Sequence, residues 1–254
     1  MPKHALITGA SRRIGIAAAV ARRLAPDGWN ITTTCLRSYD AEMPWGSAPD
    51  EADDLIREIR AHDIIATLYE DDLSDPHAPA RIFDAAEASA GMVDALVNVH
   101  TYSTHGGLVD VSADEFDRHI AVNSRGTLLM MAEFARRWRG EPGTGRIVNF
   151  TSGLPLIGAI AYAASKGAIE WLTISAAGEL APRGISVNAV NPGPNDTGWM
   201  PPELYAGINA RSPMGRVGTP QDAAELVAFL VSPVSGWITA QVLNSNAGWS
   251  KLLA

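Results

Sequence analysis

A strand, a glycine-containing turn and a helix follow one another near the start of the chain, and this order constrains the fold more than any other stretch. Residues 5–7 are a short apolar run, residues 8–15 read Thr-Gly-Ala-Ser-Arg-Arg-Ile-Gly, and residues 16–24 are alanine-rich and typical of a helix. In such a unit, glycines let the backbone approach a pyrophosphate, and the helix N-terminus offers unpaired N–H groups and a positive dipole. The pattern predicts a dinucleotide-binding turn. The alternative is that Gly9 and Gly15 only make a tight turn.

Strands and helices alternate along the whole chain. The expected strands lie at residues 5–7, 30–36, 64–69, 93–99, 146–150, 185–190 and 240–243. The expected helices lie at residues 16–24, 54–61, 79–90, 114–139, 162–182 and 221–231, and residues 41–54 and 191–217 are expected to be irregular. This alternation predicts an α/β fold with a doubly wound parallel sheet covered by helices on both faces, in three layers (α/β/α). Because no linker or repeat interrupts residues 1–254, we expect a single domain.

The composition excludes several classes of function. The chain has 254 residues, 46% of them hydrophobic and 19% charged, as in ordinary globular proteins. A net charge of -8 argues against nucleic acid or an anionic membrane surface as the main partner. The single cysteine, Cys35, excludes an internal disulfide, and the six histidines show no metal-ligand spacing, so no metal is expected. Without a signal-peptide pattern or an apolar run of about 18 residues, we expect a cytoplasmic protein without a membrane span.

Tyr162 and Lys166 lie four residues apart in a helical pattern, so they share one helix face. A phenol with an ordinary pKa near ~10 is a poor acid at neutral pH, and an ammonium group one turn away favours the phenolate. The pairing therefore suits acid–base catalysis. The alternative is a solvated helix face, where Tyr and Lys at this spacing are common.

The end of the second expected strand carries information about the cofactor. A free ribose 2′-hydroxyl usually meets an acidic side chain there, whereas a 2′-phosphate prefers a basic one. The strand ends at Leu36-Arg37 without an acid, Arg12 and Arg13 lie in the first turn, and Asp40 follows too far on. The pattern favours NADP(H), with NAD(H) possible. The alternative is that the arginines are solvated surface charges.

Two segments are candidates for contact with a substrate. His100 and His105 follow the fourth expected strand, at the sheet edge where ligands bind in such folds. Residues 194–217 could form a lid over the site. The alternative is that both are ordinary surface loops. The candidate substrate residues are His100, Tyr102, Leu154, Trp199 and Met200.

Several short motifs occur in a fixed order along the chain. They are Thr8-Gly9 with Gly15, Asp72-Leu73, Asn98, Ala121-Val122-Asn123, Thr151-Ser152, Tyr162-x-x-x-Lys166, and Asn191-Pro192-Gly193 with Thr197. Together they resemble the classical short-chain dehydrogenase/reductase family, and most of all its 3-oxoacyl-carrier-protein-reductase-like branch. The resemblance implies a Rossmann-like sheet, a nicotinamide cofactor, and a ketone or secondary alcohol of small or medium size as substrate. It also implies a homo-oligomer, a homotetramer or a dimer.

The resemblance further implies roles for individual residues. Tyr162 would be the general acid for the carbonyl oxygen, and Lys166 would lower the tyrosine pKa and bind the nicotinamide ribose. Ser152 would orient and polarise the carbonyl, and Asn123 would hold a water that links Lys166 to solvent. The implied cofactor-binding residues are Gly9, Ser11, Arg12, Arg13, Ile14, Gly15, Arg37, Asp72, Leu73, Asn98, Tyr162, Lys166, Pro192, Gly193, Asn195 and Thr197.

Three features depart from the family pattern. Arg13 stands at the middle glycine, residues 98–101 read Asn-Val-His-Thr instead of Asn-Asn-Ala-Gly, and Ser152 precedes Tyr162 by only ten residues. These departures keep an alternative open, a non-catalytic member of the family that senses nucleotides or acts as a scaffold. The presence of all four catalytic residue types favours the enzyme. A dehalogenase or epimerase on this fold is disfavoured, because dehalogenases replace the lysine and lose the glycine turn.

Overall fold

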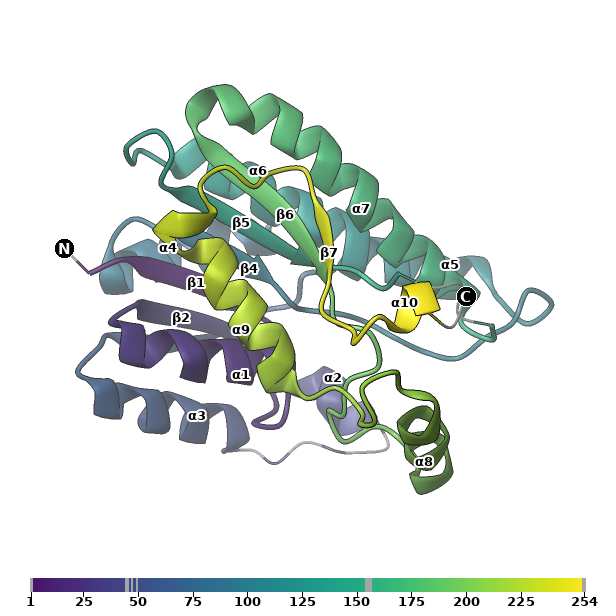
Figure 1. Cartoon of the computed structure of the whole chain (residues 1–254). Coiled ribbons are helices and arrows are strands. Elements are labelled where there is room, and N and C mark those ends of the chain that lie inside the picture. Colours follow the sequence, from purple (N-terminus) through teal and green to yellow (C-terminus); the bar gives the residue numbers. More distant parts are fainter. Residues whose placement is uncertain (1, 44–45, 47, 49, 154–156, 253–254) are drawn as a thin grey trace.

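The computed structural model describes residues 2–43, 46, 48, 50–153 and 157–252. Across these residues the chain forms one sheet of seven parallel strands in the order β3-β2-β1-β4-β5-β6-β7 (Figure 1). The strands are β1 (His4–Thr8), β2 (Asn30–Cys35), β3 (Ala66–Glu70), β4 (Ala95–Asn98), β5 (Gly145–Phe150), β6 (Ile185–Asn191) and β7 (Val242–Asn244). The predicted doubly wound parallel sheet is confirmed.

Helices cover both faces of the sheet, as predicted (Figure 1). One face carries α1 (Ile16–Leu24), α3 (Glu51–Ile59) and α9 (Pro220–Val231), and the other carries α4 (Ala78–Ala90), α6 (Gly126–Arg137) and α7 (Ile160–Leu180). Alternate strand residues point to opposite faces, so Ile7 packs with the first set of helices and Leu6 with the second. Because both faces are covered, every residue of β1 is buried, and its middle residues 5–7 form a continuous apolar run.

Three helices lie where the sequence predicted none: α2 (Arg37–Glu42), α8 (Pro202–Arg211) and α10 (Trp249–Leu252). Proline is well tolerated in the first turn of a helix, where its missing N–H is not needed, so Pro202 begins α8 rather than breaking a helix. Arg37 is not the last strand residue but the first residue of α2. The expected helical region at residues 114–139 is divided into α5 (Ala113–His119), a π-helical turn η3 (Ile120–Arg125) and α6.

The order of the strands creates a crevice at one edge of the sheet. β1 pairs with β2 on one side and with β4 on the other, so the connections after β1 and β4 leave in opposite directions. Ligands of open α/β sheets bind at this reversal, outside the carboxyl ends of the strands. Among the described residues, no helix is long and apolar enough to cross a membrane, and no group of three His, Cys, Asp or Glu side chains could hold a metal ion.

Candidate active site

The glycine turn after β1 packs closely against the segment that follows β4. Gly9 has a φ angle of +81°, and a Cβ atom there would lie 2.7 Å from the Cα atom of His100, so a larger residue does not fit. Gly15 precedes α1, whose first turn carries no acidic residue. Ser11 Oγ accepts a hydrogen bond from the N–H of Leu36 at 3.2 Å and ties the turn to the end of β2. This narrow backbone beside a helix N-terminus fits a pyrophosphate.

A second glycine lies where the chain leaves β6. Gly193 has a φ angle of +64°, and a Cβ atom there would overlap the Cβ of Asn246. The buried Asn195 donates a hydrogen bond from Nδ2 to the carbonyl of Pro192 at 2.6 Å. Its Oδ1 is also buried and has no hydrogen-bond partner within the described part of the chain. Such an acceptor, beside the half-buried Thr197, fits the amide of a nicotinamide.

Tyr162 and Lys166 lie one turn apart near the start of α7. The Nζ of Lys166 lies 5.8 Å from the centre of the Tyr162 ring and donates a hydrogen bond to the carbonyl of Phe150 at 3.1 Å. Burial lowers the pKa of Lys166 to about 8. Burial also raises the pKa of Tyr162 to about 12, although a hydrogen bond with Thr101 opposes this shift. The expected lowering of the Tyr162 pKa is therefore not found, and the phenol keeps its proton at neutral pH.

Asn123 joins the segment after β4 to α7. It is buried in the π-helical turn η3, a kind of turn that is frequent at functional sites, and its Oδ1 accepts a hydrogen bond from the N–H of Tyr102 at 2.7 Å. Its Nδ2 donates to the carbonyl of Tyr102 and to Ser165 Oγ, both at 2.9 Å. Both amide protons are thus used within the protein. The side chain holds the segment after β4 against α7. The water expected to link Lys166 to solvent would therefore have to bind another group of Asn123.

His100 lies beneath the site rather than facing it. Its Nδ1 lies 2.7 Å from Thr8 Oγ1, and its Nε2 lies 3.2 Å from the carbonyl of Val122. Thr8 Oγ1 already accepts the N–H groups of Val99 and His100, so its own proton goes to Nδ1, and the ring carries its proton on Nε2. Burial, aided by the charge of Lys166, lowers the pKa of His100 to about 3. His100 is a neutral structural residue, and this geometry does not support the predicted contact with a substrate.

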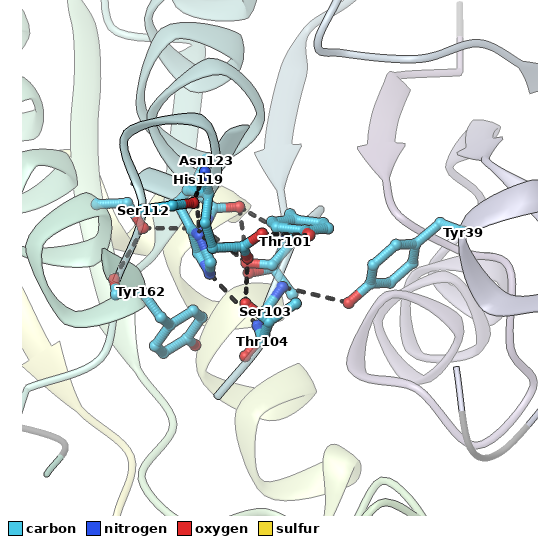
Figure 2. Close-up of polar contacts among 11 residues, drawn as sticks. Tyr39, Thr101, Ser103, Thr104, Ser112, His119, Asn123 and Tyr162 are labelled. Atoms are coloured by element: carbon cyan, nitrogen blue, oxygen red, sulfur yellow. Dashed lines mark hydrogen bonds and ion pairs between the residues drawn. The ribbon is translucent and has the colours of Figure 1, made fainter. Parts of the chain in front are cut away.

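Figure 2 shows polar contacts around Tyr162 that the sequence analysis missed. The ring of His119 packs edge-on against Tyr102, with centroids 4.8 Å apart, and against Tyr162 at 6.5 Å. His119 is fully buried; Nδ1 donates to the carbonyl of Glu115 at 2.8 Å, and Nε2 accepts the N–H of Thr104 at 3.3 Å. His119 therefore fixes the loop after β4 beside the candidate catalytic tyrosine. Its signal in the sequence is weak, because four-residue spacing from Glu115 is common in helices.

Tyr102 is also engaged within the protein. Its hydroxyl donates to the Glu115 carboxylate at 3.3 Å, and the Arg118 guanidinium lies 4.6 Å from the centre of its ring. Tyr39 of α2 packs against it at 5.7 Å, and the Tyr39 hydroxyl accepts the N–H of Ser103 at 3.2 Å (Figure 2). This hydrogen bond links the elements that follow β2 and β4. The buried Tyr102 holds the loop together, and the predicted substrate contact is not supported for its side chain.

The segment that leaves β5 is held between α7 and β6. Thr151 Oγ1 donates to the carbonyl of Lys166 at 2.9 Å, and a Cβ atom on Gly153 would overlap the Asn191 side chain. Ser152 lies between these two fixed points and is half-buried. Its catalytic role stays a prediction. Leu154 lies outside the described residues.

Three residues predicted to bind the cofactor have side chains engaged within the protein. Asn98 Nδ2 donates to Asn149 Oδ1 at 2.9 Å, whereas Asn98 Oδ1 is buried without a partner among the described residues. Leu73 is buried, and Asp72 Oδ1 accepts the N–H of Ser74 at 2.8 Å, which closes a turn. The direct contact of these residues with a cofactor stays a prediction.

Two of the basic residues expected to select the cofactor, Arg37 and Arg13, are paired with acids. The main-chain N–H of Arg37 donates to Glu70 Oε1 at 2.9 Å. The Arg37 guanidinium pairs with Glu70 and, at 2.7 Å, with Asp53. Arg13 pairs with Glu58 at 2.7 Å. The two arginines are thus held at the crevice rim by neighbouring carboxylates, an arrangement that the sequence did not indicate.

Residues 194–217 form a loop whose two ends are joined. Asn195 and Gly218 form a β-bridge, in which the N–H of Gly218 donates to the carbonyl of Pro194 at 3.2 Å. The N–H of Asp196 donates in return to the carbonyl of Gly218 at 2.9 Å. We call this pair of contacts the clasp. The clasp holds the two ends of the loop together, so that the residues between them could move as a unit. A lid requires such an arrangement.

The loop rests on the turn after β1. A Cβ atom on Gly198 would lie 3.0 Å from Nη2 of Arg12 and 3.5 Å from Cδ1 of Ile14. Trp199 is 41% exposed and Met200 is half-buried. The loop therefore contacts the predicted cofactor turn, whereas the contact of Trp199 and Met200 with a substrate stays a prediction.

Comparisons with known proteins agree with this arrangement. A family model described as Enoyl-(Acyl carrier protein) reductase matches residues 9–250. The chain is 41% identical over 251 residues to the uncharacterized oxidoreductase YjdA of Bacillus subtilis (strain 168), covering 97% of this chain and 96% of that relative.

Two solved structures are similar over 98% of this chain and 98% of their own. One is a short chain dehydrogenase from Burkholderia cenocepacia J2315 in complex with NADP, with a TM-score of 0.86 and 33% identity. The other is a blue fluorescent protein from a metagenomic library in complex with NADPH, with a TM-score of 0.87 and 32% identity. Similarity along nearly whole chains shows shared descent as well as a shared fold.

Proposed function

Because this chain belongs to the short-chain dehydrogenase/reductase family, we propose that it is an NADP(H)-dependent oxidoreductase, a carbonyl reductase that interconverts a ketone and a secondary alcohol. The observation that carries the proposal is the pair formed by Tyr162 and Lys166 on α7. Lys166 Nζ lies 5.8 Å from the centre of the Tyr162 ring. Asn123 holds the neighbouring loop after β4 by a hydrogen bond to Tyr102. The pair lies at the carboxyl edge of the sheet, where ligands of this fold class bind.

Tyr162 acts as the general acid and base. Because burial raises its pKa to about 12, the phenol is protonated at neutral pH and can give its proton to a carbonyl oxygen. The Lys166 ammonium then stabilises the phenolate that remains. Ser152 orients the carbonyl. Asn123 holds the loop after β4 against α7 through its hydrogen bonds to Tyr102 and Ser165. The bound nicotinamide supplies or accepts the hydride.

The cofactor is held by groups from several strand ends. Gly9 and the start of α1 receive the pyrophosphate, and Asn195 and Thr197 receive the carboxamide. A preference for NADP(H) over NAD(H) is supported by Arg37, which follows a β2 strand without an acid at its end. It is also supported by the NADP and NADPH in the two similar structures. The substrate enters beside the lid residues Trp199 and Met200.

The outer face of α6 and α7 supports assembly into a homo-oligomer, a dimer or a tetramer. Leu128 is 43% exposed, Trp171 is 74% exposed, and both line a mostly apolar groove of about 470 Å³. Exposed apolar surface of this kind marks an interaction site. We further propose a cytoplasmic location, which is consistent with the buried free thiol of Cys35.

The proposal is tested by titrating the protein with NADPH and NADH and then assaying a panel of ketones and aldehydes by cofactor absorbance. Tyr162→Phe should lower kcat by about 100-fold or more and leave the Kd for NADPH unchanged, because only the proton donor is lost. Tyr69→Phe, on β3 where the ring packs against the apolar cluster under α4 and α6, is the matched control and should change neither value.

The outcomes separate the candidate functions. Turnover that survives in the Tyr162→Phe variant would show that another group is the acid. NADPH binding by the unmodified protein without turnover of any carbonyl compound would favour a nucleotide-sensing or scaffolding role. Binding of neither cofactor would contradict the proposal as a whole.

A further inference from the structure

Glu70 occupies an unusual position at the rim of the crevice. It is the last residue of β3 and pairs in register with Cys35, the last residue of β2. Its Oε1 accepts the main-chain N–H of Arg37 at 2.9 Å, and its Oε2 pairs with the Arg37 guanidinium. Glu70 therefore supplies, from a neighbouring strand, the carboxylate that the end of β2 lacks.

Glu70 accepts hydrogen bonds from the main-chain N–H and the guanidinium of Arg37, and a bound phosphate group would use the same two donors. In dinucleotide-binding sheets the adenosine ribose lies at the end of the second strand, where an arginine receives the 2′-phosphate of NADP(H). Carboxylate and phosphate bind arginine with the same forked geometry, and both accept main-chain N–H groups. A 2′-phosphate bound to Arg37 would have to replace Glu70, because two anions cannot share these donors without repulsion.

From this geometry we infer that Glu70 determines the choice between the two cofactors by competing with the 2′-phosphate for Arg37. The carboxylate leaves Arg37 when NADP(H) binds and stays in place when NAD(H) binds. The unmodified protein therefore prefers NADP(H) less strongly than Arg37 alone would dictate. This inference rests on the proposed function, since it concerns the same cofactor site.

The exchange is physically accessible. The side chains of Glu70 and Arg37 are 40% and 31% exposed, so the carboxylate can turn into solvent, and ion pairs at such positions are weak. Asp53 binds a different guanidinium nitrogen, Nη2, at 2.7 Å. Asp53 can therefore keep holding Arg37 while the nitrogen facing Glu70 changes partner.

The test is the substitution Glu70→Gln, measured by calorimetric binding rather than by turnover. The ligands are NADPH, NADH, and the fragments adenosine 2′,5′-bisphosphate and 5′-AMP, which differ only in the 2′-phosphate. Removing the competing charge should raise the affinity for NADPH and for the bisphosphate by about twofold to fivefold, an effect typical of an exposed charge pair. The affinity for NADH and 5′-AMP should not rise.

Glu87→Gln is the matched control. Glu87 of α4 pairs with Arg137 of α6 rather than with an arginine of the cofactor site, and its side chain is 32% exposed, so it carries the same charge at similar exposure. If Glu87→Gln raises NADPH affinity as much as Glu70→Gln, the effect is a general loss of negative charge and the inference is overturned. The same holds if Glu70→Gln leaves the NADPH-to-NADH ratio unchanged or lowers it. If the unmodified protein binds neither cofactor, the proposed function fails first, and the two failures are thus distinguishable.

Discussion

At the scale of single residues, the catalytic role proposed for Lys166 requires a buried charge that lowers the stability of the fold. Its ammonium is buried next to Tyr162 and has the carbonyl of Phe150 as a hydrogen-bond acceptor at 3.1 Å. The pKa of Lys166 falls from its ordinary value of 10.5 to about 8, because burial penalises the charge. The folded protein therefore holds this proton less tightly than the unfolded chain does. Lys166 lowers the free energy of unfolding below pH 8, and this penalty shrinks as the pH rises from 8 toward 10.5.

Lys166→Met removes the charge and keeps the length of the side chain. We expect the free energy of unfolding at pH 7 to increase by about 1 kcal/mol, while turnover is lost. Urea unfolding at pH 7 and pH 9 checks this, and the gain should be smaller at pH 9. Lys251→Met, at an exposed position of α10, should change stability little at either pH. A less stable Lys166→Met variant at pH 7 would mean that the hydrogen bond to Phe150 outweighs the burial of the charge.

Some residues of the candidate site can be predicted from their spacing in the sequence, and others come together only in the folded chain. Tyr162 and Lys166 could be predicted because their spacing within one helix fixes their geometry. His119, Tyr39 and Glu70 could not, because each acts on a residue far away in the sequence: Tyr162, Ser103 and Arg37. His100 was predicted to contact a substrate from its residue type and position alone, whereas both nitrogens of its ring have partners within the core.

At the scale of elements, apolar runs were a reliable guide to strands and proline was a poor guide to helix ends. β1 and β5 are buried along their whole length, so their apolar runs stand out from the surrounding loops. α8 was missed because Pro201 and Pro202 suggested an irregular loop, whereas they begin a helix. The π-helical turn η3 within the expected long helix was also missed, because one extra residue per turn leaves little trace in the apolar pattern.

The clasp at the base of residues 194–217, the proposed lid, provides a prediction at this scale. A Cβ atom on Gly218 would lie 2.9 Å from the carbonyl of Pro194 and 3.0 Å from Asn195 Nδ2. Gly218→Ala should therefore force apart the two chain segments that form the clasp. We expect faster hydrogen–deuterium exchange in residues 196–217 by about tenfold, and a higher KM for the carbonyl substrate. Gly207→Ala, in α8 where a Cβ meets nothing within 4 Å, is the matched control and should not speed exchange. Unchanged exchange in the Gly218→Ala variant would show that the clasp does not restrain the lid.

At the scale of the whole molecule, the apolar face of α6 and α7 predicts self-association. Trp171→Asp puts a charge into the groove that Trp171, Leu128 and Leu172 line, so an oligomer built on this face should dissociate. Light scattering coupled to gel filtration should show a fall in mass for this variant. Val109→Asp changes an equally apolar position, 93% exposed, away from the groove, and should keep the original mass. An unchanged mass for Trp171→Asp would place the subunit contact on another face.

The first and the last long helices of the chain share one apolar cluster. Buried alanines of α1 form one apolar cluster with Ala223 and Val227 of α9 and with Ala5 and Ile7 of β1. The two helices lie side by side (Figure 1). During synthesis, β1 and α1 emerge early, yet the helix that covers them is complete only after residue 231. For most of translation, the apolar surface of β1 and α1 beside the glycine turn is therefore not yet covered by α9. Exposed apolar surface of this kind promotes aggregation and chaperone binding. The cofactor site can thus take its final shape only as the C-terminal part of the chain leaves the ribosome.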